Sequence, residues 1–297
     1  MKTNATKNLM VIVVSLFIFN VQHTFAQNTQ SVKHANSLLW EISGNGLVQP
    51  SYMFGTMHII DSAYYFLEET VIEKFNKCEK IVFEVDMSDP EFQQKSQSVL
   101  MMEDDSLENL ISKAEYEKVK TFFSKELNIP LEKVKKIKPY YLSSFVASIN
   151  IPENLKSYED ELMKIADSQN QEILGVSTVE KESEILVDRI PLLIQAKLLL
   201  EAIDNVDFMV EIRDNLVEAY LDQDIDRFYE ITSSDNEYEI VNESMFQKRH
   251  EVWIPNMKQL MSKYSCFFAV GVAHLASEDG LIELLKHQGY KVESVLE

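Results

Sequence analysis

Residues 50–59 read P-S-Y-M-F-G-T-M-H-I, and residues 266–275 read C-F-F-A-V-G-V-A-H-L. Each stretch is a short apolar and aromatic run that closes on Gly-x-x-His and a branched aliphatic residue. Apolar runs of this length, bounded by turn or helix signals, are typical of buried strands. The two motifs pair Gly55 with His58 and Gly271 with His274.

Helix-start residues follow both histidines. Asp61 or Ser62 would begin a helix after the first motif, and Ser277 would begin one after the second. Both histidines are therefore expected at the carboxyl end of a buried strand, where ligands collect in open α/β sheets. A glycine before each histidine lets the backbone approach closely. Imidazole is the commonest metal ligand in proteins and the usual acid–base group near neutral pH.

A structural explanation of the same histidines stays open. A single buried histidine is more often a hydrogen-bonded core residue than a metal ligand. The chain has only 7 Gly and 6 His, and the two motifs use two of each. This repetition favours a shared functional site.

The remaining chain divides into β/α ends and a helical middle. Apolar or alternating runs predict strands at residues 38–43, 52–57, 80–87, 172–176, 266–272 and 290–295. Helical spacing predicts helices at residues 66–76, 114–127, 140–149, 159–168, 191–203, 208–229, 239–261 and 277–287. Pro255 is expected to interrupt the helix over residues 239–261.

These elements predict an α/β fold, with α+β as the alternative. The expected architecture is a mixed sheet that carries the two strand–Gly-x-x-His–helix elements side by side. A large helical insertion occupies residues from about 90 to 262. No low-complexity linker divides residues 27–297, so a single domain is predicted.

The amino terminus has the pattern of a secretory signal peptide. Lys2 and Lys7 precede an apolar stretch at residues 9–21, which is short for a membrane span, and cleavage is expected after Ala26. The signal peptide would then occupy residues 1–26 and the protein would be periplasmic or extracellular. An uncleaved membrane anchor is the alternative. After cleavage, no stable membrane insertion is expected.

The composition limits the classes of molecule that the protein is expected to bind. The formal net charge of −20 argues against nucleic acid and anionic membrane surfaces as partners.

Cys78 and Cys266 each lie at the start of a predicted strand. A disulfide between them and two buried free thiols both remain open, and the sequence gives no oligomeric state.

Two carboxylates and an arginine are candidates to complete a site with the histidines. Glu84 lies in an otherwise apolar strand, where a carboxylate needs a partner. Asp86 shares its face by alternation and could be a ligand or an orienting residue. Arg249 could hold a carboxylate or a developing oxyanion. His250 points about 100° away from it on the same helix, so the two are not expected to face one site.

The chain resembles the TraB/PrgY/GumN family, which includes the Tiki proteins. The resemblance is carried by L-L-W-E-I-S at 38–43, Y-M-F-G-T-M-H-I at 52–59, F-E-V-D at 83–86, E-D-E-L-M-K-I-A at 159–166, I-L-G-V-S-T at 173–178, K-R-H-E-V-W at 248–253 and F-F-A-V-G-V-A-H-L at 267–275, followed by G-L-I-E-L-L-K-H-Q-G-Y-K-V at 280–292. It implies a compact α/β fold with adjacent Gly-x-x-His elements. Tiki proteins are metalloproteases that depend on ions such as manganese or cobalt, whereas other branches are described as pheromone-shutdown proteins or have no assigned biochemistry.

The resemblance carries over to particular residues. His58 and His274 match the motif histidines, Glu84 the acidic strand position and Arg249 the helix arginine. The chain also departs from the family pattern. His250 replaces the usual Asn, Ser177 replaces a Glu, and Glu159 replaces an Asp near a helix start. Glu180, one helical turn after Ser177, is a candidate substitute for the missing carboxylate.

The sequence therefore predicts a metal-dependent hydrolase that acts on a peptide or protein substrate. His58, His274 and Glu84 would bind a divalent ion (manganese, cobalt or zinc), and Glu84 or Asp86 could act as general base. Arg249 would stabilise charge or anchor the substrate. The alternative is a non-catalytic protein that binds or sequesters a peptide, a metal or haem.

Overall fold

The structure is a computed structural model that describes residues 32–233 and 238–295. The predicted signal peptide lies outside the described residues. The strands are β1 (Leu39–Gly44), β2 (Ser51–Thr56), β3 (Ile60–Asp61), β4 (Lys80–Val85), β5 (Leu155–Lys156), β6 (Glu172–Ser177), β7 (Cys266–Gly271) and β8 (Tyr290–Ser294).

Six strands form one mixed sheet in the order β6-β4-β7-β2-β1-β8. The pairs β6–β4, β4–β7 and β7–β2 are parallel, whereas β2–β1 and β1–β8 are antiparallel. The two motif strands are therefore direct neighbours, with Gly55 opposite Val270 and Thr56 opposite Gly271. The predicted α/β class and the side-by-side motifs are confirmed. Strands β3 and β5 form a separate two-stranded ribbon.

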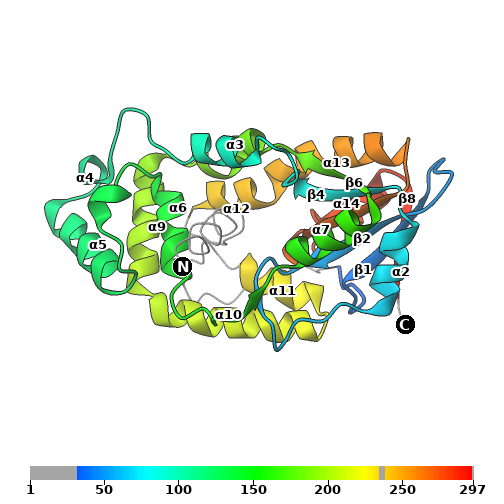
Figure 1. Cartoon of the computed structure of the whole chain (residues 1–297), viewed down its shortest axis with the longest axis horizontal. Helices are drawn as coiled ribbons and strands as arrows, with labels where there is room; N and C mark the ends of the chain where they lie inside the picture. Colours follow the sequence, from blue (N-terminus) through cyan, green and yellow to red (C-terminus); the bar gives the residue numbers. More distant parts are fainter. Residues whose placement is uncertain (1–31, 234–237, 296–297) are drawn as a thin grey trace.

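Helices surround this sheet and extend from one end of it (Figure 1). They are α2 (Glu69–Lys77), α3 (Phe92–Val99), α4 (Leu107–Leu110), α5 (Lys113–Lys125), α6 (Pro139–Ala147), α7 (Tyr158–Gln169), α8 (Val179–Ser183), α9 (Leu192–Asp204), α10 (Val206–Leu221), α11 (Ile225–Thr232), α12 (Glu239–Met245), α13 (Gln247–Met261) and α14 (Leu281–His287). Short turns of other helix types are η1 (Leu131–Lys133), η2 (Glu184–Asp188) and η3 (Val272–His274).

Two apolar cores hold these elements. The larger one covers the sheet, where β2 and β7 are buried along their whole length. The smaller one lies among α4, α5, α6 and α9, at the end of the molecule away from the sheet (Figure 1). Since no sheet residue belongs to the smaller core, the helical insertion carries its own packing.

Polar residues before several helices explain where these helices begin. Ser112 and Glu115 form a capping box at the start of α5. Ser157, Thr178 and Asp224 each accept a hydrogen bond from a backbone N–H in the first turn of α7, α8 and α11. These bonds satisfy N–H groups that have no partner within the helix.

Two predicted long helices are each divided. The helix predicted over residues 208–229 breaks between α10 and α11, where Gln223 adopts a φ of 53°. The helix over residues 239–261 breaks at Phe246, while Pro255 lies inside α13. The predicted break at Pro255 was therefore wrong. Apolar spacing continued across both breaks, which is why the pattern did not reveal them.

Helices follow both motifs later than the sequence suggested. After His58 the chain enters β3, and α2 begins only at Glu69. After His274 it makes a turn in which Ser277 has a φ of 80°, and α14 begins at Leu281. The expected starts at residues 61–62 and at residue 277 were wrong, because these polar residues serve turns instead.

Cys78 and Cys266 are free thiols, and both are buried. Cys78 also receives a hydrogen bond from the hydroxyl of Ser265, at 3.6 Å. Burial raises the pKa of Cys78 to about 11 and that of Cys266 to about 12, which keeps both thiols protonated near neutral pH. Of the two possibilities the sequence left open, the structure shows the thiols.

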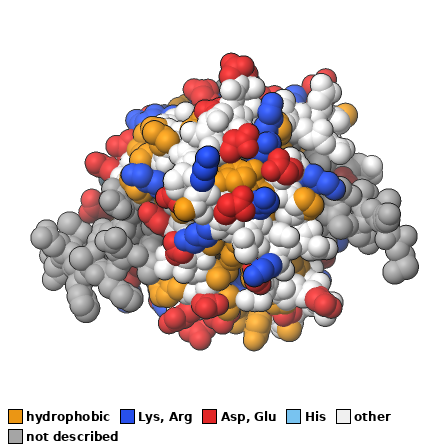
Figure 2. All heavy atoms as spheres, turned by 90° about the vertical axis from the view of Figure 1, so that its left-hand side faces the viewer, with side chains coloured by type: hydrophobic (Ala, Val, Ile, Leu, Met, Phe, Trp, Pro, Cys, Tyr) orange, Lys and Arg blue, Asp and Glu red, His pale blue; other side chains and the backbone are white. Residues whose placement is uncertain are grey.

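Charged residues of both signs share the exposed face of the helical end. Figure 2 shows Lys and Arg side chains interspersed with Asp and Glu over this face, with small hydrophobic areas between them. The acidic excess of the chain therefore does not gather into a single patch on this face.

In residues 32–233 and 238–295, no helix is long and apolar enough to cross a membrane.

Adding a methyl group at Gly55 should destabilise the motif pair. An added Cβ would lie 2.8 Å from Cδ1 of Leu275 and 3.0 Å from Cγ2 of Val272, closer than real Cβ contacts. Because the core is close-packed, we expect Gly55→Ala to lower the free energy of unfolding by about 1–3 kcal/mol. Chemical denaturation monitored by circular dichroism measures this change.

The double variant Gly55→Ala/Val272→Ala is the control. Removing the methyl groups of Val272 relieves the contact of the added Cβ with Cγ2 but leaves the contact with Leu275, so the Gly55 substitution should cost less in this background than in the wild type. An equal cost in both backgrounds would contradict the contact between β2 and the second motif.

Candidate functional site

The site forms where β2, β4 and β7 end at one edge of the sheet. Glu84 is the penultimate residue of β4, Gly271 ends β7 and Thr56 ends β2. His58 follows β2 by two residues, and His274 closes η3. The predicted position of both histidines, at the carboxyl ends of buried parallel strands, is confirmed.

The carboxylate of Glu84 lies at the centre of the cluster and is buried. Its Oε1 accepts a hydrogen bond from the backbone N–H of Gly271 at 2.8 Å, and its Oε2 accepts one from Arg249. Burial alone would raise the pKa of Glu84. The positive charges of Arg249 and His58 outweigh burial and hold this pKa below its ordinary value, so the carboxylate is ionised near neutral pH.

Arg249 in α13 is buried and has an acceptor at each of three nitrogens. Its Nε donates to Glu182 at 2.6 Å, one terminal NH2 group donates to Glu84, and the other donates to Nε2 of His274 at 2.7 Å. The guanidinium also stacks over the ring of Trp253, 4.3 Å from its centroid. All of these contacts are to the protein itself, which fixes the orientation of the guanidinium.

His274 and His250 continue this chain of hydrogen bonds. Nδ1 of His250 lies 2.7 Å from the carbonyl oxygen of Asp279, and Nε2 of His250 lies 2.9 Å from Nδ1 of His274. A carbonyl can only accept, so His250 donates to it and receives a hydrogen bond from Nδ1–H of His274. Nε2 of His274 then carries the lone pair that accepts from Arg249.

Both imidazoles in this chain are neutral near pH 7. Burial and the nearby charge of Arg249 lower the pKa of His250 to about 4. The same two causes hold the pKa of His274 well below its ordinary value. The neutral state agrees with the single proton that each ring contributes to the chain of hydrogen bonds.

The expectation that Arg249 and His250 could not face one site was wrong. Both contact His274, although they are adjacent on α13. The imidazole of His274 offers its two nitrogens in different directions. Two side chains that diverge by about 100° around a helix can therefore each reach one nitrogen.

His58 is held by a separate carboxylate. Its Nδ1 lies 2.8 Å from Oε1 of Glu159, an oxygen that also accepts a hydrogen bond from the hydroxyl of Thr56 at 2.6 Å. Burial would lower the pKa of His58, but Glu159 and then Glu84 outweigh it and raise this pKa to about 9. The pKa of Glu159 falls to about 2, because the interaction with His58 outweighs burial.

Two candidate carboxylates from the sequence do not contact this cluster. Asp86 lies beyond the end of β4, and its Oδ1 accepts hydrogen bonds from the backbone N–H and the hydroxyl of Ser88. Glu180 is exposed. The structure does not bring Asp86 or Glu180 into the described cluster, and their proposed roles as ligand, base or substitute carboxylate stay predictions. Strand alternation predicted the face of Asp86 but not the end of the strand.

Sequence reasoning missed two carboxylates that do belong to the site. Glu182, two residues after Glu180, is buried and accepts hydrogen bonds from Arg249 and from the indole N–H of Trp253 at 2.9 Å. Glu159 was noted only as a departure from a family pattern. In a helix start with alternating acidic and basic residues, nothing in the sequence marks Glu182 as the buried one.

The two motif glycines act differently. Gly55 packs against Leu275 and Val272, whereas Gly271 borders the polar cluster. A Cβ on Gly271 would lie 3.2 Å from Nε2 of His58 and 3.3 Å from Oε1 of Glu84. Because Gly271 has no side chain, space remains beside Nε2 of His58 and Oε1 of Glu84.

The residue types suit a divalent cation, with two obstacles. Nε2 of His58 and Nε2 of His274 lie 3.9 and 4.0 Å from Oε1 of Glu84. However, Arg249 already donates to that nitrogen of His274. The raised pKa of His58 also keeps a proton on its Nε2 near neutral pH, which an ion would have to displace. Within residues 32–233 and 238–295, no group of three or more His, Cys, Asp or Glu side chains has a metal-binding arrangement.

Removing the buried guanidinium should destabilise the fold strongly. Arg249→Met leaves Glu84 and Glu182 buried without their counter-ion, and breaking a buried pair in this way costs about 3–5 kcal/mol. Chemical denaturation measures the loss. The control is Arg189→Met, because Arg189 is exposed and pairs with Glu243 at 3.6 Å. This variant should cost less than about 1 kcal/mol, and equal losses in the two variants would contradict the buried network.

The pair of His58 and Glu159 should make stability depend on pH. The folded pKa of His58, about 9, exceeds its ordinary 6.5, so its contribution is complete below pH 6.5 and is lost as the pH rises through 9. The folded pKa of Glu159, about 2, is below 4.5, so its contribution is complete above pH 4.5 and is lost as the pH falls through 2.

We therefore expect the metal-free protein to lose about 1–2 kcal/mol of unfolding free energy between pH 6.5 and pH 9 that Glu159→Gln does not lose. Denaturation curves at a series of pH values measure both proteins. If the curves of wild type and variant stay parallel over this interval, His58 is not held as an imidazolium.

The comparison with known protein families gave a match. The sequence model of the TraB/PrgY/gumN family matches residues 38–294, which include both Gly-x-x-His motifs, Glu84 and Arg249. Neither the comparison with curated proteins nor the comparison with solved structures gave a match. The family match covers most of the chain, from β1 to the end of β8. The chain belongs to the TraB/PrgY/gumN family.

Proposed function

We propose that this protein is a metal-dependent hydrolase that acts on peptides, exported by its amino-terminal segment to the periplasm or the exterior. One observation carries the proposal. His58, Glu84 and His274, from different segments of the chain, bring their donor atoms together at the carboxyl ends of parallel strands. This is where active sites form in α/β sheets.

His58 has the features of a metal ligand oriented by a carboxylate. Glu159 accepts the hydrogen bond from Nδ1, which directs Nε2 towards Oε1 of Glu84. Histidine ligands commonly donate their second N–H to a carboxylate, which fixes the ring and raises its basicity. His58, Glu84 and His274 would hold the ion, with manganese, cobalt and zinc as the candidates.

A bound divalent ion would supply electrophilic polarisation of a peptide carbonyl and acidify an attacking water. The residues of the chain would do the rest. Arg249 keeps Glu84 ionised and in place, and it would have to withdraw from Nε2 of His274 to free that lone pair. Oε1 of Glu84 faces both histidines. This oxygen would either coordinate the ion or, instead, accept the proton from the water as general base.

A non-catalytic binding protein is the alternative. The hydrogen bond between Arg249 and His274 favours it, because this bond occupies the lone pair that a third ligand must provide. In that case the cluster would be a structural network beside a binding pocket for a peptide, a metal or haem. Metal content and turnover, measured on the same preparation, separate the two functions.

The double variant His58→Ala/His274→Ala tests the hydrolase. We expect the wild type to bind a divalent ion and to cleave peptides with manganese or cobalt present, and the variant to lose both properties. Elemental analysis of the purified protein and chromatography of digested peptides measure them. His287→Ala is the matched control, because His287 is exposed on the last turn of α14 and lies outside the cluster.

A folded wild-type protein that binds no divalent ion and cleaves no peptide would refute the hydrolase. Metal or peptide binding without cleavage would favour the binding protein. Loss of activity in His287→Ala as well would show that the effect is not specific to the two motifs.

A further inference from the structure

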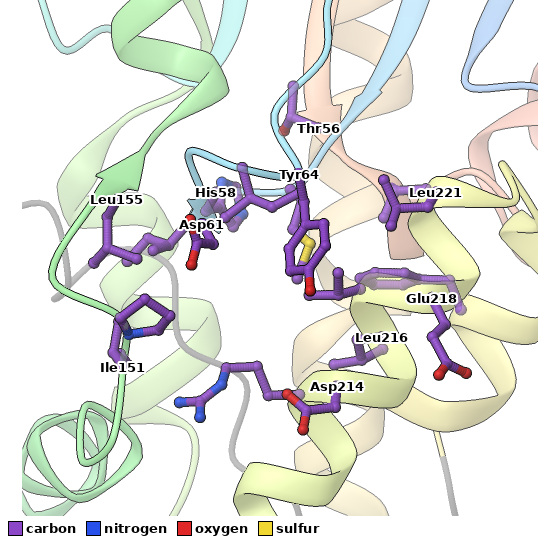
Figure 3. A pocket seen from close by; sticks show the side chains of 18 of the residues that line it. Thr56, His58, Asp61, Tyr64, Ile151, Leu155, Asp214, Leu216, Glu218 and Leu221 are labelled. Atoms are coloured by element: carbon purple, nitrogen blue, oxygen red, sulfur yellow. The ribbon is translucent and has the colours of Figure 1, made fainter.

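A cavity of about 450 Å³ opens beside the candidate site. Thr56, His58 and Val272 form the part of its wall that it shares with the two motifs, and α10 forms much of the opposite wall. Figure 3 shows His58, Asp61 and Leu155 on one side of this cavity and Leu216 and Asp214 on the other. A ligand in this cavity would therefore touch the backbone that presents His58.

Most of the wall is apolar. Leu216, Phe228 and Val272 are buried parts of it, whereas Tyr64, Leu155 and Leu221 are 52%, 39% and 39% exposed. Large hydrophobic side chains left exposed at the edge of an apolar cavity mark a surface that a ligand can cover. The cavity thus favours an apolar molecule.

The described lining of the cavity includes two cations, the imidazolium of His58, which is paired with Glu159, and the guanidinium of Arg213. The pairing of Arg213 differs from that of the other arginines. Arg189, Arg227 and Arg249 each form an ion pair with a carboxylate. In the described part of the chain, Arg213 has no ion pair with a carboxylate. Its guanidinium instead donates to the backbone carbonyls of Ile149, at 3.4 Å, and Asn150, at 2.9 Å.

This leaves a partly buried positive charge with neutral acceptors only. Burial lowers the pKa of Arg213, and the charge of Asp214 offsets only part of that effect. The carbonyls occupy two of its donor positions, and a guanidinium has five. An anion at the remaining positions would form charge-assisted hydrogen bonds.

Three acidic side chains restrict what this anion can be. Asp61, Asp214 and Glu218 also line the cavity, and Glu218 pairs with Arg227. Oδ1 of Asp61 accepts a hydrogen bond from the local backbone N–H of Ala63, at 2.9 Å, and among the described residues no cation forms an ion pair with Asp61. A ligand with a second negative charge would be repelled by these carboxylates. The lining therefore suits a molecule with an apolar body and a single anionic end.

We propose that this cavity binds an apolar molecule that ends in one carboxylate, with Arg213 as the counter-ion of that carboxylate. Two sources share this chemistry: the carboxyl terminus of a short apolar peptide, and a fatty acid. The role of the cavity as a substrate pocket rests on the proposed hydrolase, whereas the binding itself does not. A peptide held in this way would place its terminal residues beside His58.

Two pairs of ligands, each a carboxylate and its amide, test whether the cavity recognises a negative charge. Calorimetry in the presence of a chelator would compare acetyl-Leu-Leu-Phe with its carboxamide, and dodecanoate with dodecanamide. We expect the carboxylate of at least one pair to bind about tenfold or more tightly than its amide, the size of one charge-assisted hydrogen bond. A preference in the tripeptide pair identifies a peptide terminus, and a preference in the dodecanoate pair identifies a fatty acid.

Arg213→Gln should remove this preference and leave amide binding unchanged. Arg189→Gln is the matched control, because Arg189 pairs with Glu243 and neither residue lines the cavity. Arg213→Lys tests whether the preference for the carboxylate is lost through misfolding. This variant keeps the positive charge and should retain part of the preference. Thermal denaturation checks that each variant is folded.

Three results would overturn the proposal: no binding of either pair to the wild type, equal binding of carboxylate and amide, or a preference that survives in Arg213→Gln. Failure of the proposed hydrolase is a different result. Carboxylate-dependent binding without any metal-stimulated cleavage would reject the hydrolase and keep the cavity as a binding site.

Discussion

The structure depends on the burial of one cation, the guanidinium of Arg249. Taking an ion pair out of water costs several kcal/mol for each ion, and only a complete set of hydrogen bonds offsets that cost. Here Nε and both terminal groups each have an acceptor, in Glu182, Glu84 and His274. These acceptors come from α8, β4 and η3, so a single side chain of α13 holds together segments from the middle and both ends of the chain.

The same network sets the charge of each group that the proposed chemistry would use. Glu84 is ionised because Arg249 and His58 offset its burial, and His274 is neutral because burial and Arg249 disfavour a second proton. The hydrogen bond that stabilises this arrangement also occupies Nε2 of His274. Stability and ligand binding therefore compete for one lone pair, and a bound ion would have to replace the interaction that Arg249 makes there.

The sheet and the position of the histidines could be predicted from the sequence because their signals are local. Short apolar runs identified the strands, and the repeated Gly-x-x-His pattern placed both histidines at strand ends. The partners of these side chains could not be predicted in the same way. Glu182 and Glu180 lie on one short helix, and only the tertiary position of Arg249 decides which of the two is buried.

Helix geometry misled the assignment of His250 for a related reason. The direction of a side chain on its own helix is local, but its reach depends on the shape of the group that it meets. Because His274 has nitrogens on both sides of its ring, it accepts from Arg249 and donates to His250 at once. The roles proposed from the sequence for His58, Glu84, His274 and Arg249 stay predictions.

A buried hydroxyl links the cavity to the first motif. Tyr220 of α10 donates to the carbonyl oxygen of Gly55 at 3.0 Å. The same helix carries Arg213 and Leu216 in the cavity wall. A ligand that packs against α10 and pairs with Arg213 would therefore contact a helix that is hydrogen-bonded to Gly55 of β2. Gly55 lies three residues before His58. Because buried polar groups are nearly always hydrogen-bonded, this bond ties α10 to the strand that leads to His58.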